Sequence, residues 1–221
     1  MSSKVSRRLR QPLAKEVLEY VFLPRLNREF HANFGLLNQI NFAHLLMLGE
    51  QRILDAGSVA RLAAALVRIE DEGPEGVELD ANREEAYFNY EAHLIQLVGA
   101  DLGGRLHTAR SRNDMGATID RIRARDFVVR LGRSLNALAE AALVRAERHV
   151  DCVMPGYTHM QAAQPITYGH YLSALVDAWS RDLRRLLHVL DSADGCPLGA
   201  CALAGTSFEI DRDATSRALG F

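Results

Sequence analysis

Two long segments with regularly spaced apolar residues limit the possible folds of this chain more than any other feature. In each segment the apolar residues recur at alternating intervals of three and four. This spacing predicts long helices that bury one side in a bundle of nearly parallel helices. Such a stripe packs either in the core of one subunit or against a second subunit. The stripes are Val128, Leu131, Leu135, Leu138 and Ala142 in segment 117–150, and Leu172, Val176, Trp179, Leu183, Leu186 and Leu190 in segment 165–190.

The sequence before these stripes predicts several shorter helices separated by helix-stop signals. Ser58 suits the N-cap of a helix that ends at Gly73, because its hydroxyl can accept from an unpaired backbone amide. Asp80 suits the N-cap of a further helix that ends at Gly99. These signals place most of the N-terminal part of the chain in helices.

Strands are not predicted anywhere in the chain, because no run of residues alternates between apolar and polar. Segments 154–165 and 195–213 are predicted as loops, since both are rich in Gly, Pro and small residues. Pro165 fits the first turn of the second long helix, where no amide donor is lost. The predicted fold class is therefore all-α.

Composition excludes several classes of partner. Among 221 residues the formal net charge is −2, so no excess of positive charge favours nucleic acid or an anionic membrane. No stretch approaches 18 uninterrupted apolar residues, and the basic N-terminus lacks the apolar run of a secretory signal. Cys152, Cys196 and Cys201 lack the spacing of metal ligands, which predicts reduced thiols in a cytoplasmic protein.

The segment "HTARSRND", residues 107–114, concentrates hydrogen-bonding groups immediately before the first long helix. Arg110 and Arg112 can clamp carboxylates as bidentate donors, and the serine and asparagine around them add neutral donors. Asp114 suits the cap of the helix that follows. Composition alone leaves two interpretations open: an anion clamp, or a capped helix entry with solvated arginines.

His159 is the second candidate for chemistry. It lies beside Thr158 and near Gln161, and imidazole titrates close to neutral pH, as a general acid or base requires. The alternative is a solvated histidine in a loop, which is the more common situation for an isolated histidine.

Two further polar groups carry a weaker signal. Thr206 and Ser207 can bind an anion, but a packing loop before a capped helix explains them equally well. Arg121, Arg123 and Arg125 are two residues apart, which spreads them around a helix and favours a solvated surface over a nucleic-acid stripe. The sequence contains no Gly-rich phosphate loop, G-x-S-x-G motif or metal-ligand spacing.

Three long stretches together resemble the argininosuccinate lyase family, within the fumarase/aspartase superfamily. They are "GGRLHTARSRNDMGATIDR" (103–121), "VMPGYTHMQAAQPITYGHYL" (153–172) and "PLGACALAGTSFEIDRD" (197–213). They occur in the family's order and at similar separations, which is far more specific than a short motif. The resemblance extends over nearly all of the chain from Ala43 onward.

The resemblance implies a fold and an activity. The fold is a small N-terminal helical domain, residues 1–112, followed by the first long helices of a central helical bundle, residues 113–221, truncated before the bundle is complete. Members of the family release fumarate from an N-substituted aspartate by anti β-elimination of the amine, for example argininosuccinate to arginine and fumarate in arginine biosynthesis. The implied protein is a cytoplasmic homotetramer that binds a small N-succinyl amine, without a cofactor or metal and without nucleic-acid or membrane partners.

The matching motifs also imply site residues. His159 is implied in proton transfer, directly or through a relay. The donors in the loop at 107–114 are implied to hold the two carboxylates of the succinyl group. The implied substrate-binding residues are Ser111, Arg112, Asn113, Thr158, Gln161 and, from the N-terminal region, Asn41.

The N-terminal region departs from the family pattern at three positions. Leu37 and Asn41 stand where the family usually has aspartate and serine, and Tyr87 stands where it often has histidine. Because this region helps to recognise the leaving amine, a related lyase acting on another N-substituted aspartate is the alternative. A non-catalytic structural homologue, like the lyase-derived lens crystallins, is a second alternative.

The family's flexible catalytic loop, which resembles "GSSxMPxKxNP", has no counterpart in residues 1–221 and is expected beyond Phe221. This loop supplies the serine that serves as base. We therefore expect the chain 1–221 by itself to be catalytically inactive.

Overall fold

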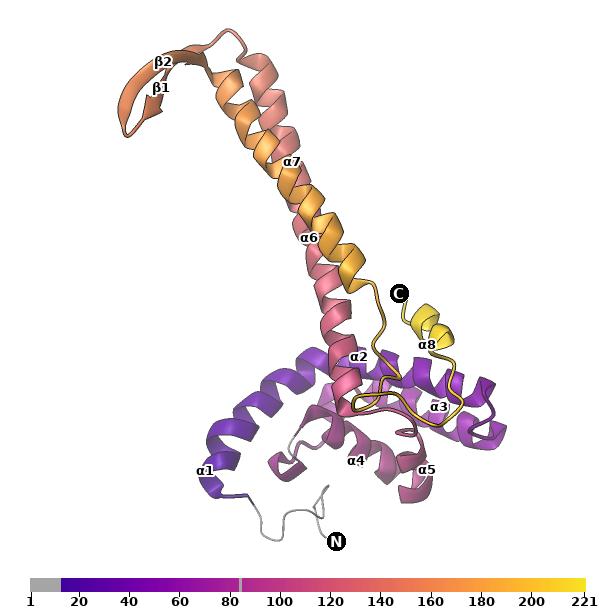
Figure 1. The fold of residues 1–221 in the computed structure, drawn as a ribbon. Helices are drawn as coiled ribbons and strands as arrows, with labels where there is room; N and C mark the ends of the chain where they lie inside the picture. Colours follow the sequence, from indigo (N-terminus) through magenta and orange to yellow (C-terminus); the bar gives the residue numbers. More distant parts are fainter. Residues whose placement is uncertain (1–12, 84) are drawn as a thin grey trace. The chain divides into compact units, whose positions relative to one another are not determined.

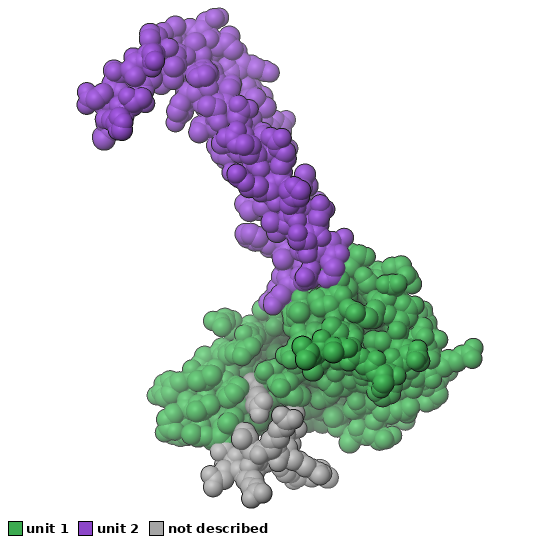
Figure 2. Space-filling model, viewed as in Figure 1, with its two compact units in different colours: residues 1–119, 196–221 green, residues 120–195 purple. Residues whose placement is uncertain are grey.

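The computed structural model describes residues 13–83 and 85–221 and is mostly helical, as the apolar periodicity predicts (Figure 1). The chain forms two compact units (Figure 2). Unit 1 comprises the residues up to Ile119 together with Cys196–Phe221, and unit 2 comprises Asp120–Gly195. The predicted domain boundary at residue 112 stays a prediction.

Unit 1 is a cluster of helices around one apolar core. Long helix α2 packs against α3, α4 and α8, and fully buried side chains such as Phe30, Ile40, Leu66 and Tyr90 fill the space between them. Its elements are α1 (Lys15–Val17), the π-helical turn η1 (Leu18–Phe22), α2 (Leu23–Glu50), α3 (Ala56–Glu72), the 3₁₀ turns η2 (Pro74–Gly76) and η3 (Ala81–Arg83), α4 (Ala86–Val98), α5 (Ala100–Arg105), the start of α6 (Arg112–Arg148) and α8 (Arg212–Ala218).

Helix α3 ends where the sequence predicts, but its N-cap lies three residues before the predicted one. Asp55 is the N-cap: its carboxylate accepts from the Ser58 amide at 2.9 Å and from the Ser58 hydroxyl at 2.6 Å. The assignment of Ser58 as N-cap is therefore wrong, because the Asp55 carboxylate caps the helix at its positive end and Ser58 lies within the first turn as a donor to this carboxylate. Gly73 stops the helix with φ of 70°.

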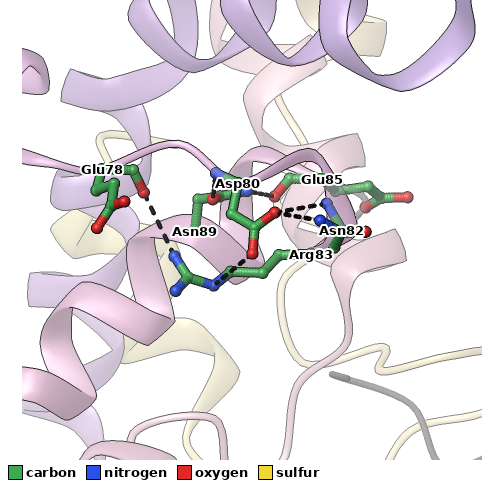
Figure 3. Close-up of polar contacts among 6 residues, drawn as sticks. All are labelled: Glu78, Asp80, Asn82, Arg83, Glu85 and Asn89. Atoms are coloured by element: carbon green, nitrogen blue, oxygen red, sulfur yellow. Dashed lines mark hydrogen bonds and ion pairs between the residues drawn. The ribbon is translucent and has the colours of Figure 1, made fainter. Parts of the chain in front are cut away.

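Asp80 does not cap a long helix, contrary to the prediction. Its Oδ1 accepts from the backbone and side-chain nitrogens of Asn82 at 2.9 and 2.8 Å, and its own amide donates to Oδ1 of Asn89 (Figure 3). Asp80 thus begins only the short turn η3, because an Asx side chain that bonds two residues ahead favours a turn. Helix α4 begins later and ends before Gly99, which is the predicted stop.

Unit 2 consists of the rest of α6, a β-hairpin and helix α7 (Tyr168–Ala193), which runs alongside α6 (Figure 1). The hairpin pairs β1 (Val153–Thr158) with β2 (Gln161–Thr167) antiparallel. The assignment of segment 154–165 as a loop is therefore wrong. Both strands are mostly exposed on both faces, so no alternation of apolar and polar residues marks them in the sequence.

Helix α7 begins at Tyr168 rather than at Pro165. Thr167 is its N-cap, with a side-chain oxygen that accepts from the His170 amide at 3.0 Å. Pro165 lies in β2, where a two-stranded sheet consists only of edge strands and tolerates a residue without an amide donor.

The apolar stripes of α6 and α7 are only partly covered within unit 2. Ala142 and Val176 are buried in the contact with Trp179, whereas Leu131 and Leu138 are 41% and 50% exposed. An apolar groove of about 360 Å³ lies between the helices, lined by Val128, Val129, Gly132, Arg133, Leu183, Leu186, Leu187 and Leu190.

The arginines at the start of unit 2 contact the end of α7. Arg121 donates to the carbonyl of Ser192 at 2.6 Å, and Arg125 pairs with Asp194 at 3.2 Å. Cations at the negative end of a helix are favourable, so these contacts give the arginine run a structural role. Within the described part of the chain, no helix combines the length and apolar character needed to cross a membrane.

Candidate functional site

The loop 107–114 divides into buried anchors and accessible donors. Arg110 and Asp114 are buried, whereas Ser111 and Arg112 are half-buried and Asn113 is exposed. The interpretation that both arginines form one clamp is therefore wrong for Arg110. The donors that remain accessible are three consecutive residues at the start of α6.

Asp114 fixes the start of α6 through both carboxylate oxygens. Its Oδ1 accepts from the Ser111 amide at 2.8 Å, and the Ser111 hydroxyl accepts from the Asn113 amide at 3.3 Å. This reciprocal pattern is a capping box with Ser111 as the N-cap. Asp114 therefore caps the helix, as the sequence predicts, but from its third position.

The second oxygen of Asp114 ties the helix start to the segment after α7. It accepts from the amides of Gly199 and Cys201 at 3.0 and 2.8 Å. Gly199 has φ of 91°, and a Cβ there would lie 2.9 Å from Cγ of Arg212. The small residues of this segment thus allow close backbone packing, as their composition suggests.

Arg110 is only 6% exposed and reaches two helices of unit 1. Its Nη2 donates to Oδ1 of Asn41, on α2, at 2.6 Å and to the hydroxyl of Tyr87, on α4, at 3.2 Å. Its Nε and Nη1 have no hydrogen-bond partner, and neither does Nδ2 of Asn41. Among the residues that the structure describes, no carboxylate pairs with Arg110.

The Tyr87 hydroxyl is the centre of a buried polar network. It donates to Glu91 at 3.1 Å and accepts from Arg110, and Nδ1 of His107 lies 2.8 Å away as a further donor. Burial raises the pKa of Tyr87 and the pKa of Glu91 above their ordinary values. Burial and then the positive charge of Arg110 lower the pKa of His107 to about 4, so this histidine is neutral at pH 7.

His44 contacts the loop 107–114 at Thr108. Its Nε2 lies 2.8 Å from the carbonyl of Thr108, which requires a protonated Nε2 as donor. Burial, followed by the charge of Arg110, lowers the pKa of His44 to about 3. The ring is therefore neutral at pH 7 and its proton is committed to the loop.

Arg112 faces the surface and contacts helix α4 and its cap. Its Nη1 lies 3.0 Å from Oε1 of Glu85, and its guanidinium carbon lies 4.5 Å from the centroid of the Phe88 ring. Both charged side chains are more than a third exposed, so this ion pair contributes at most about 1 kcal/mol. A carboxylate ligand can therefore compete with Glu85 for this guanidinium.

His159 lies at the exposed tip of the hairpin. His159 and Met160 form the two-residue turn between Thr158 and Gln161, with φ of 49° and 62°. Two positive φ values are characteristic of a type I′ turn, which usually contains Asn or Gly. Left-handed backbone at two ordinary residues is unfavourable and tends to occur at functional sites.

The same hairpin borders a groove of about 340 Å³ in unit 2. Thr158 and Gln164 contribute polar groups to this groove, and Met154 and Tyr171 contribute apolar walls. The hairpin thus carries the predicted residues Thr158, His159 and Gln161, and Thr158 also borders the groove.

The predicted site residues therefore belong to two separate structural groups. Ser111, Arg112 and Asn113 stand together at the start of α6 in unit 1. Asn41 is also in unit 1 but is 1% exposed, and it contacts Arg110. The hairpin group of unit 2 consists of Thr158, His159 and Gln161.

Sequence reasoning missed the roles of Arg110 and Glu85. Nothing in the segment 107–114 distinguishes Arg110 from Arg112, since both are flanked by small or polar residues. Asn41 and Tyr87 did provide a signal, because they depart from the family pattern, and both contact Arg110.

Comparison with known proteins defines the class. A family model described as "Lyase" matches residues 36–221. The chain therefore belongs to this lyase family, which is part of the fumarase/aspartase superfamily, in agreement with the resemblance of its motifs.

The chain is also similar to individual argininosuccinate lyases. The chain is 36% identical over 214 residues to argininosuccinate lyase 1 of Shouchella clausii, covering 97% of this chain and 43% of that protein. It is 45% identical over 182 residues to argininosuccinate lyase 1 of Mesorhizobium japonicum, covering 82% and 39%. The chain thus spans about two fifths of the length of these relatives.

Among solved structures, the chain is similar to an EDDS lyase variant with bound fumarate. The TM-score is 0.77 at 33% sequence identity, and the match covers 94% of this chain and 41% of that chain. EDDS lyase in complex with formate matches equally well, with a TM-score of 0.77 and 33% identity.

Proposed function

We propose that this chain is the N-terminal part of a carbon–nitrogen lyase that releases fumarate from an N-substituted aspartate, with argininosuccinate as the substrate. The observation that carries the proposal is the division of the loop 107–114, which buries Arg110 and Asp114 and leaves three adjacent donors accessible. The identity to argininosuccinate lyases supports the substrate.

The accessible donors suit the electrostatic requirement of β-elimination. A base removes the proton from the carbon beside one carboxylate, and the electrons of that C–H bond pass into the carboxylate. They then return to form the double bond as the C–N bond breaks and the amine leaves with a proton. The intermediate state carries two negative charges on that carboxylate. Preorganised donors stabilise such a charge by several kcal/mol, and the positive end of α6 adds to them.

Five of the candidate residues have a defined part in this scheme. Ser111, Arg112 and Asn113 bind the carboxylates of the succinyl group, and Thr158 binds the same substrate. His159 takes part in proton transfer, for which an imidazole suits neutral pH. No metal or organic group enters the scheme.

The assembly is part of the proposal. We propose a homotetramer in which several subunits build each active site, so that the loop of unit 1 and the hairpin of unit 2 act together across subunits. The serine loop of the family has no counterpart in residues 1–221, and these residues supply two corners of the site. A cytoplasmic location is also part of the proposal, since the sequence predicts reduced cysteines.

The second candidate function is a lyase that releases a different amine. Asn41 and Tyr87 replace the usual serine and histidine near the amine side, and the likeness to EDDS lyase at 33% identity favours a lyase for another N-substituted aspartate. The succinyl half of the substrate would be the same.

The test is reverse addition by the full-length protein. Fumarate is supplied with arginine or with ethylenediamine, and the N-substituted aspartate is measured by mass spectrometry. Formation of argininosuccinate supports the first candidate, and a product from ethylenediamine alone supports the second. No addition with any amine, together with no release of fumarate, contradicts both and favours a non-catalytic homologue.

A further inference from the structure

The proposed chemistry makes no direct use of Arg110, although this side chain lies immediately before the accessible donors. It is 6% exposed and forms hydrogen bonds with Asn41 of α2 and Tyr87 of α4. We propose that Arg110 is a positioning residue, which fixes Ser111, Arg112 and Asn113 for binding of the succinyl carboxylates. This inference rests on the proposed function of those three residues.

The backbone around Arg110 explains why the donors need such an anchor. Ala109 has φ of 61°, a left-handed conformation that an alanine adopts only where its surroundings impose it. His44 holds the carbonyl of Thr108 on one side, the Cys201 thiol contacts the carbonyl of Ala109, and Arg110 holds the other side. Without Arg110 the left-handed residue is free to relax, and Ser111 moves with it.

The anchor on the far side of the donors is independent of Arg110. Asp114 holds the Ser111 amide and the amides of Gly199 and Cys201. Loss of Arg110 therefore keeps these hydrogen bonds and the folded start of α6, but it releases the segment before Ser111 that fixes where the capped helix start and its donors lie in unit 1. This separation predicts a folded variant with misplaced donors rather than a disordered loop.

The hydrogen-bond partners of Arg110 indicate that it positions the donors rather than neutralises the charge of a carboxylate. Both are neutral groups, and no carboxylate pairs with the guanidinium in the described part of the chain. Glu91 is hydrogen-bonded to the Tyr87 hydroxyl and feels the positive charge of Arg110, but it forms no ion pair with the guanidinium. One guanidinium nitrogen, Nη2, thus bridges the two helices by donating to both acceptors.

The experiment uses the full-length protein with Arg110→Met, Arg110→Lys and, as a matched control, Arg68→Met. Arg68 is 64% exposed and pairs with Glu72 on its own helix. We expect kcat for fumarate release to fall at least 30-fold in Arg110→Met with a smaller change in KM, because misplacement by about 1 Å can lower rates about 100-fold. The kcat of Arg110→Lys should be at least tenfold higher than that of Arg110→Met. The kcat of Arg68→Met should stay within twofold of the wild-type value.

A second readout does not depend on turnover. In labelled protein, the backbone amide resonances of Ser111 and Asn113 should shift in Arg110→Met and move back toward the wild-type positions in Arg110→Lys. Tyr87→Phe, which removes one acceptor and keeps the ring, should shift the same amides, and it serves as the test if Arg110→Met does not fold.

Two results overturn the inference. One is a folded Arg110→Met variant with kcat within threefold of the wild type and a lower melting temperature, which identifies a purely structural arginine. The other is unchanged amide resonances at residues 111–113 in every variant. Failure of the proposed function is distinct, because the wild-type protein itself would then release no fumarate while the resonances still report on the anchor.

Discussion

At the scale of single residues, burial separates side chains that look equivalent in the sequence. Arg110 and Arg112 are two positions apart in one loop, yet one bridges two helices inside unit 1 and the other stacks on Phe88 near the surface. The left-handed Ala109 turns the chain immediately before Arg110. Local composition predicts the donors of the loop but not which of them stay accessible.

Acid should destabilise unit 1 through its buried histidines. The pKa of His44 is about 3 in the folded protein and near 6.5 when the chain unfolds, so the unfolded state binds more protons between these values. The free energy of unfolding therefore falls as pH drops below 6.5, by up to about 1.4 kcal/mol per pH unit from His44 alone. His107, with a pKa of about 4, adds in the same direction.

Urea denaturation of the chain at pH 7.0, 6.0 and 5.0 measures this slope. His44→Gln is the control, because an amide can donate to the Thr108 carbonyl but does not titrate. An equal slope in His44→Gln and the wild type would contradict the assignment to His44.

Removal of the Asp114 carboxylate should cost about 3 kcal/mol of stability. In Asp114→Ala the amides of Ser111, Gly199 and Cys201 lose their acceptor, and each buried amide left unpaired costs about 1 kcal/mol or more. Thermal or urea denaturation measures the loss. Asp213→Ala, at an exposed position of α8, should change stability by less than about 0.5 kcal/mol, and equal losses in the two variants would refute the role of Asp114.

At the scale of elements, helices with one buried side were predictable, and the hairpin was not. Periods of three and four mark α6 and α7, and Gly73 and Gly99 mark helix ends. Strands β1 and β2 are solvated on both faces, and their turn consists of His159 and Met160, without glycine. Neither periodicity nor turn composition therefore reveals them.

The left-handed turn makes the hairpin sensitive to the residue at position 160. Met160 is 93% exposed, so its side chain contributes little packing. Met160→Gly should strengthen the hairpin by up to about 1 kcal/mol, and Met160→Val should weaken it by a similar amount, because a branched side chain disfavours positive φ. Hydrogen exchange of the β1 and β2 amides measures both, and greater protection in Met160→Val would contradict the turn geometry.

At the scale of the whole molecule, one chain leaves much of its apolar helix surface exposed. Phe127 is 58% exposed, Leu138 50% and Leu187 60%, and the groove between α6 and α7 is almost wholly apolar. Two helices alone cannot cover all of each other's apolar residues. Further helices are therefore needed to bury the remaining apolar surface.

The chain 1–221 should therefore self-associate at micromolar concentration. Sedimentation velocity tests this expectation, and Leu138→Lys combined with Leu187→Lys should shift the distribution toward monomer. A stable monomer of the unsubstituted chain would show that the exposed stripe needs no partner.

The isolated chain should also lack lyase activity. It contains the two donor groups described above but no counterpart of the family's serine loop. An assay of fumarate release by purified 1–221, with the full-length protein as the positive control, measures this. A rate above background from 1–221 would show that the loop is dispensable.

The sequence by itself determined the helical class, the positions of the two long helices and the lyase family, because periodic burial and long motifs are local properties of the chain. It also predicted which loop carries the donors. Only the tertiary structure decided that Arg110 is buried against Asn41 and Tyr87 while Arg112 remains near the surface. These contacts join positions far apart in the chain, and burial at such contacts depends on how helices pack.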